Sequence, residues 1–251
     1  MLEKAIKLLN IIKESQNDIT LADLVKLSEL PKTTVHRILK LLCSYDYVQE
    51  TKSERYKLGI RMIEFGGSFI KQNEIVESSI SELKVLTNNV KESSFLACLS
   101  GPNTVYLYKN KSQRSITTSA EIGTVRPLYS TAVGKVFLAF VNNDLKDELL
   151  DKQSFEKHTD YTLDKEGLLQ QLKQIQKEGV AIEYSETEEG IGCIAAPIFN
   201  YEDNIIGAVS VAGPEKRIVS YSDNLKLELR KCAFRISKQL GYYLFKEAEN
   251  E

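Results

Sequence analysis

The sequence has 251 residues, 42% of them hydrophobic and 27% charged, which is typical of folded globular proteins and excludes a disordered or fibrous chain. Its net charge of −2 is too small to predict a nucleic-acid partner, and the 12 basic against 10 acidic residues among the first 75 add only a consistent sign. No apolar run approaches the roughly 20 residues that a membrane span needs, so we expect a cytoplasmic protein without membrane contact.

Helical spacing of apolar residues begins at the N-terminus. It predicts a helix over residues 2–15, a second helix capped by Thr20 and ending near Leu27, and a third over residues 32–43. Pro31 suits the start of the third helix, where a missing N–H costs nothing. The third helix buries Val35, Ile38, Leu39 and Leu42.

A short hairpin is expected next, with strands at 48–50 and 55–58 around a polar turn at 51–54. Helix, helix-turn-helix and hairpin in this order predict a winged helix-turn-helix domain over residues 1–59. Residues 60–75 form the expected linker, with a helix at about 60–71 and a hinge at or after Gly66 and Gly67.

The second domain, residues 76–251, alternates between helix and strand patterns. Helices are predicted at 76–90, 131–141, 164–178 and 221–246, and strands at 95–99, 105–109, 180–184, 193–199 and 205–212. Residues 200–204 form the turn between the last two strands. Consecutive strands joined by a turn, with helices at both ends, predict an α+β domain with an antiparallel sheet.

The third helix carries a polar face on the side away from its apolar stripe. Hydroxyl and N–H groups near its N-terminus suit phosphates, and Arg37 or Lys40 could reach base edges in the major groove of duplex DNA. A lone basic helix is usually only a solvated face, but the helix-turn-helix spacing and the hairpin favour DNA binding. The candidate contacts are Lys32, Thr33, Thr34, His36, Arg37, Lys40, Lys52 and Arg55.

The sequence patterns typical of enzymes and metal-binding proteins are incomplete in this chain. Residues 190–195 match a dinucleotide-binding pattern, but Pro197 and the flanking β-formers forbid the helix it requires. The run Val133-Gly134-Lys135 lacks the first glycine and the magnesium-binding hydroxyl of a phosphate loop. No nucleophile elbow is present, and the cysteines and histidines are scattered. We therefore expect no enzyme activity, cofactor, metal site or disulfide framework.

Five short segments carry a specific resemblance. In the first domain they are residues 30–39 (LPKTTVHRIL), Tyr47-Val48 and residues 55–59 (RYKLG). In the second domain they are residues 126–135 (RPLYSTAVGK) and 188–197 (EEGIGCIAAP). Together they resemble the isocitrate lyase regulator (IclR) family of bacterial transcription factors. The similarity covers nearly the whole chain. It implies a GAF-like C-terminal domain that binds a small effector, often a carboxylate or sugar acid, and a homodimer or homotetramer acting on operator DNA, expected to be a repressor.

The resemblance also implies an effector pocket lined by Ala132, Val133, Glu183, Cys193, Ser210 and Ala212. Relatives commonly have Asp as the pocket acid and often Ser at position 212. Free N–H groups at the start of the 131–141 helix would hold a carboxylate, which Glu183 would oppose unless it is protonated or binds a ligand hydroxyl. Without the resemblance, the strand pattern favours a buried apolar cysteine over a ligand contact at Cys193. For Glu183, a surface or salt-bridged carboxylate is as good an interpretation as a pocket acid.

The turn before the third helix and the role of the C-terminal domain each allow more than one interpretation. Position 29, often glycine in relatives, is Glu29, which predicts a strained or reshaped turn before the third helix. The alternative function is a DNA-binding regulator whose C-terminal domain serves only for oligomerisation or protein contacts and takes no small molecule.

Overall fold

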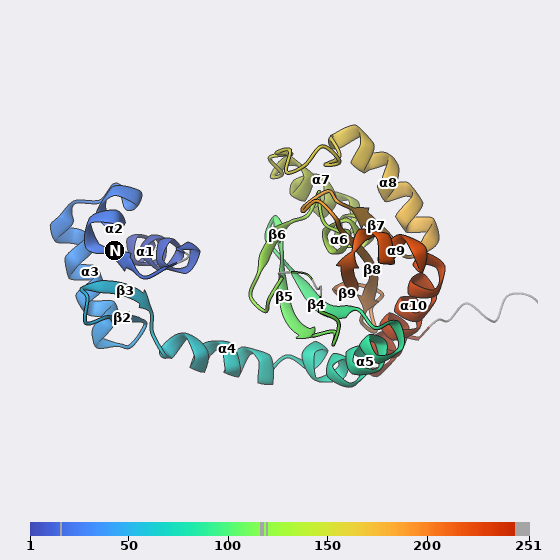
Figure 1. Ribbon diagram of the computed structural model, residues 1–251, viewed down its shortest axis with the longest axis horizontal. Coiled ribbons are helices and arrows are strands. Elements are labelled where there is room, and N and C mark those ends of the chain that lie inside the picture. The colour runs from blue at the N-terminus through green and yellow to red at the C-terminus, as the bar shows by residue number, and fades with distance from the viewer. Residues whose placement is uncertain (16, 116–117, 119, 244–251) are drawn as a thin grey trace, which may run out of the picture. The chain divides into compact units, whose positions relative to one another are not determined.

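The chain divides into two compact units, Met1–Gln72 and Asn73 onward, in the computed structural model, which describes residues 1–15, 17–115, 118 and 120–243 (Figure 1). Buried residues form one core cluster in the first unit and two in the second. Because the second unit has two clusters, its sheet is covered on both faces. None of the helices in the described ranges combines the length and apolar character needed to traverse a bilayer.

The first unit is a helical domain with a small sheet. Its elements are α1 (Leu2–Glu14), β1 (Ile19–Thr20), α2 (Leu21–Ser28), α3 (Lys32–Ser44), β2 (Val48–Glu50), β3 (Arg55–Leu58) and α4 (Arg61–Lys71). Strand β3 lies between β1 and β2 and is antiparallel to both. Leu8, Leu24, Val35, Leu39 and Tyr56 are among the buried residues that join the helices to the sheet. This order confirms the predicted winged helix-turn-helix.

The turn between α2 and α3 has a strained backbone. Thr20 caps α2 as predicted, accepting a hydrogen bond from the backbone N–H of Asp23 at 3.2 Å. At the other end, Glu29 has φ 57° and ψ 21°, a left-handed conformation that glycine adopts without cost. The strain expected at position 29 is therefore present in the backbone.

The second unit is built on a six-stranded antiparallel sheet with the order β6-β5-β4-β9-β8-β7. The strands are β4 (Ser93–Ser100), β5 (Asn103–Asn110), β6 (Val125–Pro127), β7 (Ala181–Tyr184), β8 (Ile191–Phe199) and β9 (Ile205–Pro214). The turn predicted between β8 and β9 is closed by a hydrogen bond from the Asn200 N–H to the Asn204 carbonyl at 3.0 Å. This sheet confirms the predicted α+β class.

Alternating residues of the strands pack against different helices. Phe95, Ala195 and Ala212 share a core with α6 (Ala132–Phe140), α7 (Asn143–Asp151) and α8 (Lys165–Glu178). Their neighbours Leu96, Ile194 and Val211 share the other core with α5 (Glu74–Val90), α9 (Glu215–Ser220) and α10 (Ser222–Gln239). Because side chains alternate along a strand, the sheet is the middle of three layers (Figure 1).

Several short elements and one boundary differ from the sequence-based expectation. β1, β6, α7 and α9 are absent from it, because elements of two to nine residues carry too little periodicity. The last helix was expected over 221–246, but α10 ends at Gln239, where the chain turns and Tyr242 stacks on Phe199 at 5.3 Å between ring centroids. The end of that expected helix, residues 244–246, lies outside the described residues.

Candidate functional site

The outer face of α3 gathers the polar residues singled out from the sequence. Val35, Ile38 and Leu39 are the buried side chains of this helix, so the opposite face points to solvent. Of the expected contacts on α3, Lys32, Thr33, His36, Arg37 and Lys40 are exposed and Thr34 is half-buried. The helix contains three lysine or arginine side chains and no acidic one. This local excess of positive charge is what a duplex DNA ligand requires.

The first turn of α3 keeps its backbone donors available. The N-cap is Pro31, which makes no side-chain hydrogen bond to the helix. Its carbonyl accepts from the N–H groups of Thr34 and Val35 at 2.9 and 3.0 Å. The N–H groups of Lys32 and Thr33 precede the first intrahelical bonds, and together with the helix dipole they form a site suited to a phosphate.

The β2–β3 hairpin places its two expected contacts differently. Lys52 is exposed in the turn, whose ends are joined by a 2.7 Å bond from the Thr51 N–H to the Arg55 carbonyl. Arg55 is also exposed, but its Nη1 donates to the Asp18 carbonyl at 2.9 Å, which ties β3 to the chain before β1. Arg55 therefore supports the hairpin, whereas Lys52 stands at its tip.

The second unit has a small cavity at the start of α6, against the sheet. Its volume is about 50 Å³, room for one or two water molecules. Four of the expected pocket residues line it: Ala132, Glu183, Cys193 and Ala212. The other two, Val133 and Ser210, are fully buried and do not line it. The remaining lining residues are Phe95, Tyr106, Thr118, Ala120, Arg126, Thr131, Thr187, Glu188 and Ile191.

The N-terminus of α6 is partly satisfied by its own cap. Thr131 Oγ1 accepts from the Gly134 N–H at 3.0 Å and donates to the Pro127 carbonyl at the same distance. The N–H groups of Ala132 and Val133 remain as the donors that a bound anion could use. Gly134 lets α6 lie close to the backbone of Leu128, because a Cβ at position 134 would be only 2.3 Å from the Leu128 carbonyl oxygen.

Three ionisable side chains are buried beside this cavity. Lys135 is fully buried and its Nζ pairs with Glu186 Oε1. Glu183 Oε1 accepts from the N–H groups of Glu186 and Thr187 at 2.5 and 3.3 Å. Burial, reinforced by the nearby Glu186 carboxylate, raises the pKa of Glu183 to about 7. Glu183 can therefore hold a proton at the cavity wall near neutral pH.

Burial also raises the pKa of the Cys193 thiol. The side chain is a protonated thiol, so it behaves as a weak hydrogen-bonding group and not as a nucleophile. Ser210 Oγ is buried and makes no hydrogen bond within the described residues beyond its contact with this thiol. Both residues of this pair serve the packing between α6 and the sheet.

Arg126 is the cationic residue among the nine lining residues that were not expected from the sequence. It lies on β6 at the edge of the sheet and brings a guanidinium to a cavity that already holds Glu183 and Glu188. Arg126 is the first residue of the segment 126–135, and an anion site needs a cation, so its position in that segment could have identified it as a candidate pocket residue. Glu183, Glu188 and Arg126 give the lining three ionisable side chains, and Phe95 and Ile191 add apolar ones.

The segment 185–190 forms part of the rim of this cavity. Thr187 Oγ1 donates to the Ser130 carbonyl at 2.7 Å, which ties the segment to the start of α6. Thr159 and Thr162 donate to the carbonyls of Ser185 and Glu186 at 2.6 and 2.7 Å. These few hydrogen bonds hold the rim in place beside a space smaller than the roughly 300 Å³ of ordinary small-molecule sites.

Comparison with known proteins places both units in one family. The model described as "IclR helix-turn-helix domain" matches residues 1–52, and the model described as "Bacterial transcriptional regulator IclR C-terminal" matches residues 67–238. The HTH-type transcriptional regulator KdgR of Escherichia coli is 31% identical over 235 residues, covering 91% of this chain and 88% of its own.

Solved structures agree with this placement. The Thermotoga maritima IclR structure has a TM-score of 0.72 at 28% identity and covers 96% of this chain and 98% of its own. An IclR homologue from Microbacterium hydrocarbonoxydans, solved in complex with 4-hydroxybenzoate, has a TM-score of 0.82 at 21% identity, covering 95% and 98%. The second likeness shows the shared fold.

Proposed function

The chain belongs to the IclR family of bacterial transcriptional regulators, and we propose that it binds its operator through α3 and the β2–β3 hairpin under the control of a small carboxylate effector held beside α6. The observation that carries the DNA half is the exposed face of α3, which combines three basic side chains, no acidic one and an open N-terminus. In such domains the helix after the turn lies in the major groove.

Roles within this face follow from its geometry. Arg37 lies on the exposed face one turn into the helix, where a guanidinium can bond two acceptors of a guanine. Lys32 and the free N–H groups beside it suit a phosphate, and Lys52 at the hairpin tip suits another. Arg37 is therefore the proposed base-reading residue, and the others position the protein on the duplex.

The effector half rests on the polarity of the cavity. A carboxylate would pair with Arg126 and the N–H group of Ala132, while a hydroxyl of the same molecule would bond Glu183. Protonated Glu183 does not repel an anion, so we expect affinity to rise as the pH falls through about 7. The bound 4-hydroxybenzoate of the Microbacterium homologue indicates that this fold accommodates a molecule with both groups.

The small volume of the cavity supplies the proposed link to DNA binding. A molecule of ten heavy atoms does not fit in about 50 Å³, so binding requires the rim at 185–190 to move away from Ser130. An effector that binds the open form better than the closed form shifts the population between them. Operator affinity changes only if DNA also distinguishes these two forms.

Thermal melting of the full chain with 4-hydroxybenzoate, gluconate and glucuronate tests the effector half. A ligand at about 100 times its Kd stabilises the folded state by about 2.7 kcal/mol. Arg126→Ala should abolish the rise in Tm, while Lys173→Ala on the exposed face of α8 should retain it. Flat melts at millimolar concentrations of every such acid would favour the alternative, a C-terminal domain that serves only for oligomerisation or protein contacts.

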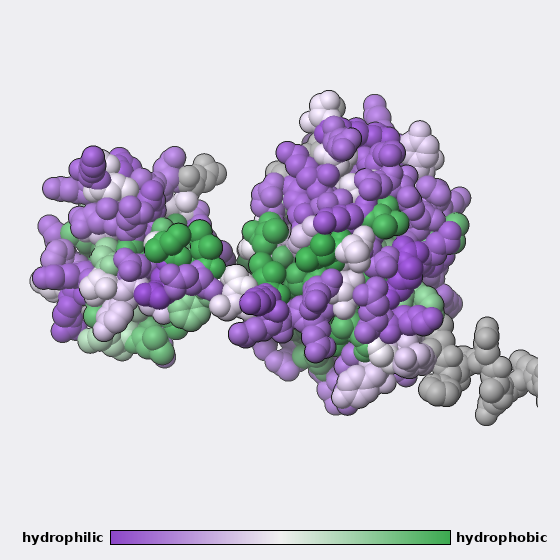
Figure 2. All heavy atoms as spheres, turned by 90° about the horizontal axis from the view of Figure 1, so that it is seen from below, coloured by the Kyte–Doolittle hydropathy of each residue, from purple (hydrophilic) through white to green (hydrophobic). Residues whose placement is uncertain are grey.

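A homodimer is proposed from the exposed surface of α4. No residue of this helix is buried, and Ile63, Phe65, Phe69 and Ile70 leave apolar side chains in solvent. Hydrophobic side chains also gather in patches on the surface of both units (Figure 2). A second copy is the proposed occupant, because paired winged helices read two half-sites of an operator. Ile63→Glu with Ile70→Glu should lower the mass measured by light scattering, and Val85→Glu, an exposed apolar site on α5, should not.

A further inference from the structure

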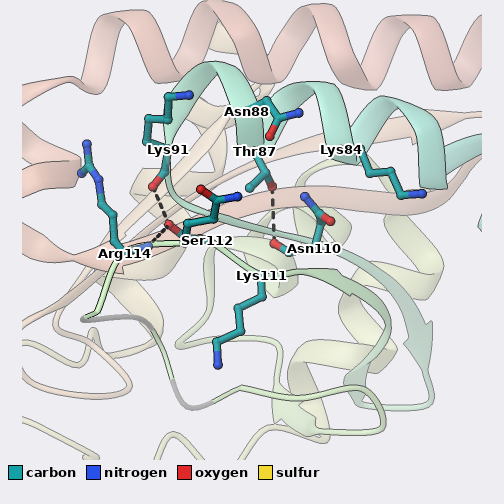
Figure 3. Close-up of a pocket in the computed structure, with 9 residues that line it drawn as sticks. Lys84, Thr87, Asn88, Lys91, Asn110, Lys111, Ser112 and Arg114 are labelled. Carbon is teal, nitrogen blue, oxygen red and sulfur yellow. Dashed lines mark hydrogen bonds between the residues drawn. The ribbon is translucent and has the colours of Figure 1, made fainter.

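A second and much larger hollow lies in the C-terminal unit, between the end of α5 and the end of β5. Its volume is about 500 Å³, within the range of small-molecule sites. Figure 3 shows helix α5 on one side of it and the end of β5 with the following segment on the other. The lining residues are Lys84, Thr87, Asn88, Lys91, Asn110, Lys111, Ser112, Gln113 and Arg114. None of them lines the cavity beside α6.

The charge around this hollow is one-sided. Four of its nine lining residues are cationic and none is acidic. Arg114 pairs with the buried Glu92 at 2.5 Å, and that carboxylate is also held by Arg217 at 2.7 Å. Across the described part of the chain, no carboxylate lies within salt-bridge distance of Lys84, Lys91 or Lys111.

Two negative features lie nearby and do not cancel this charge. The pKa of the Glu121 carboxyl is lowered mainly by Lys109, its ion-pair partner at 2.6 Å, and to a smaller extent by Lys111. The C-terminus of α5 carries roughly half a negative charge from its last carbonyls. Three cations without salt bridges exceed that half charge, so an excess of positive potential remains in the hollow.

The base of the hollow is held rigidly by buried hydroxyls. Thr87 Oγ1 bonds Ser94 Oγ at 2.6 Å, and Ser112 Oγ donates to the Lys91 carbonyl at 2.6 Å (Figure 3 draws the second). The Ser112 N–H donates to Ser93 Oγ at 3.0 Å. These bonds join the end of α5 to β4 and hold the segment after β5 against both, so the base of the hollow needs little ordering to bind a ligand.

The backbone at Lys91 is strained as well. Lys91 ends α5 with φ 62° and ψ 15°, a left-handed conformation in which a glycine would carry no steric cost. The strain places a cationic side chain at the rim where the smallest residue would suffice.

We propose that this hollow binds a compact polyanion, a small molecule that carries two or more phosphate groups or carboxylates. Several cations around one space require more than one negative charge to neutralise them, which a monocarboxylate effector does not provide. The lining contains no aromatic side chain on which a nucleobase could stack, so the ligand is a phosphorylated or polycarboxylic metabolite and not a nucleic-acid base. Phosphate suits lysine and arginine together, and the amides of Asn88 and Gln113 suit the remaining oxygens.

Isothermal titration calorimetry of the full chain with pyrophosphate and with citrate, at constant ionic strength near 0.15 M, tests the proposal. We expect saturable binding of one molecule per chain at submillimolar concentration. Lys84→Gln with Lys111→Gln should weaken it at least tenfold. The matched control, Lys173→Gln with Lys177→Gln, removes the same charge from the exposed face of α8. It should change the affinity for the polyanion less than twofold. Circular dichroism melts establish that both variants fold.

The two probes separate the two sources of the same chemistry. Tighter binding of pyrophosphate assigns the site to phosphorylated metabolites, and tighter binding of citrate assigns it to polycarboxylates. Absence of saturable heat with both probes at 5 mM overturns the proposal. So does an equal loss in both variant pairs, because it would show attraction to the net charge of the chain and not to this hollow.

Discussion

Helices α3 and α6 each begin within a segment that carries the family resemblance, yet they differ in burial and capping. Three of the 13 residues of α3 are buried, against eight of the nine residues of α6. The N-terminus of α3 has no side-chain cap, whereas Thr131 caps α6. Polar residues on the exposed face of α3 can be substituted without disturbing the packing of a core, whereas most substitutions in the buried helix α6 disturb it. Substitutions in α3 should therefore change binding, and substitutions around α6 should change stability.

The largest expected effect is the loss of one partner of the buried ion pair. Lys135→Ala leaves the Glu186 carboxylate buried without its cation, which costs about 3–5 kcal/mol of unfolding free energy. Urea unfolding followed by circular dichroism measures the loss. The double variant Lys135→Met with Glu186→Leu removes both charges and should recover most of it. A single variant within 1 kcal/mol of the parent would contradict the burial of this pair.

The next effect is a pH dependence that belongs to Glu183. Its pKa is about 7 in the folded protein against an ordinary value of 4.5, so the folded state prefers the protonated form. The stability that this preference contributes is fully present below pH 4.5 and is lost as the pH rises through 7. Between pH 4.5 and pH 8 it amounts to about 2–3 kcal/mol.

Glu183→Gln keeps the shape of the neutral form and cannot ionise. The difference in unfolding free energy between this variant and the parent should grow in favour of the variant from pH 5 to pH 8. Urea unfolding at several pH values gives this difference directly. Parallel curves for the two proteins would show that Glu183 titrates at its ordinary value.

On the exposed helix, Arg37→Ala should weaken operator binding by about 1–3 kcal/mol if the side chain reads a base, with little change in unfolding free energy. Lys52→Ala should weaken all duplexes alike, because a phosphate contact carries no sequence information. Fluorescence polarisation with a duplex selected from a random library, and with a scrambled duplex of the same length, measures both. Unchanged affinity for Arg37→Ala would exclude its role as a reader.

The smallest effect concerns the turn before α3. Glu29→Gly relieves a left-handed backbone and should stabilise the first unit by up to about 1 kcal/mol, partly offset by the greater freedom of glycine in the unfolded chain. Glu29→Gln keeps the strain and removes the charge, so it separates the two contributions. Equal stability of the glycine and glutamine variants would mean that the backbone at position 29 carries no strain.

Periodicity explains which elements the sequence predicts well. The amphipathic pattern of α3 and the capping pair Thr20 and Asp23 act within one helix, so neighbouring residues are enough to define them. β1 and β6 exist only because β3 and β5 lie beside them, which is information about distant parts of the chain. The same limit applies to the cavity beside α6, where Arg126 joins Glu183 across the fold.

The sequence by itself determined the winged helix with its basic, acid-free third helix, and it determined membership in the IclR family, because both depend on local spacing and residue type. Only the tertiary structure decided that Val133 and Ser210 lie in the core, that the cavity beside α6 is small, and that Lys84 and Lys111 line one hollow. Those facts depend on how β4, β5, β8 and β9 pack against α5 and α6, and packing between distant segments leaves no pattern in either segment alone.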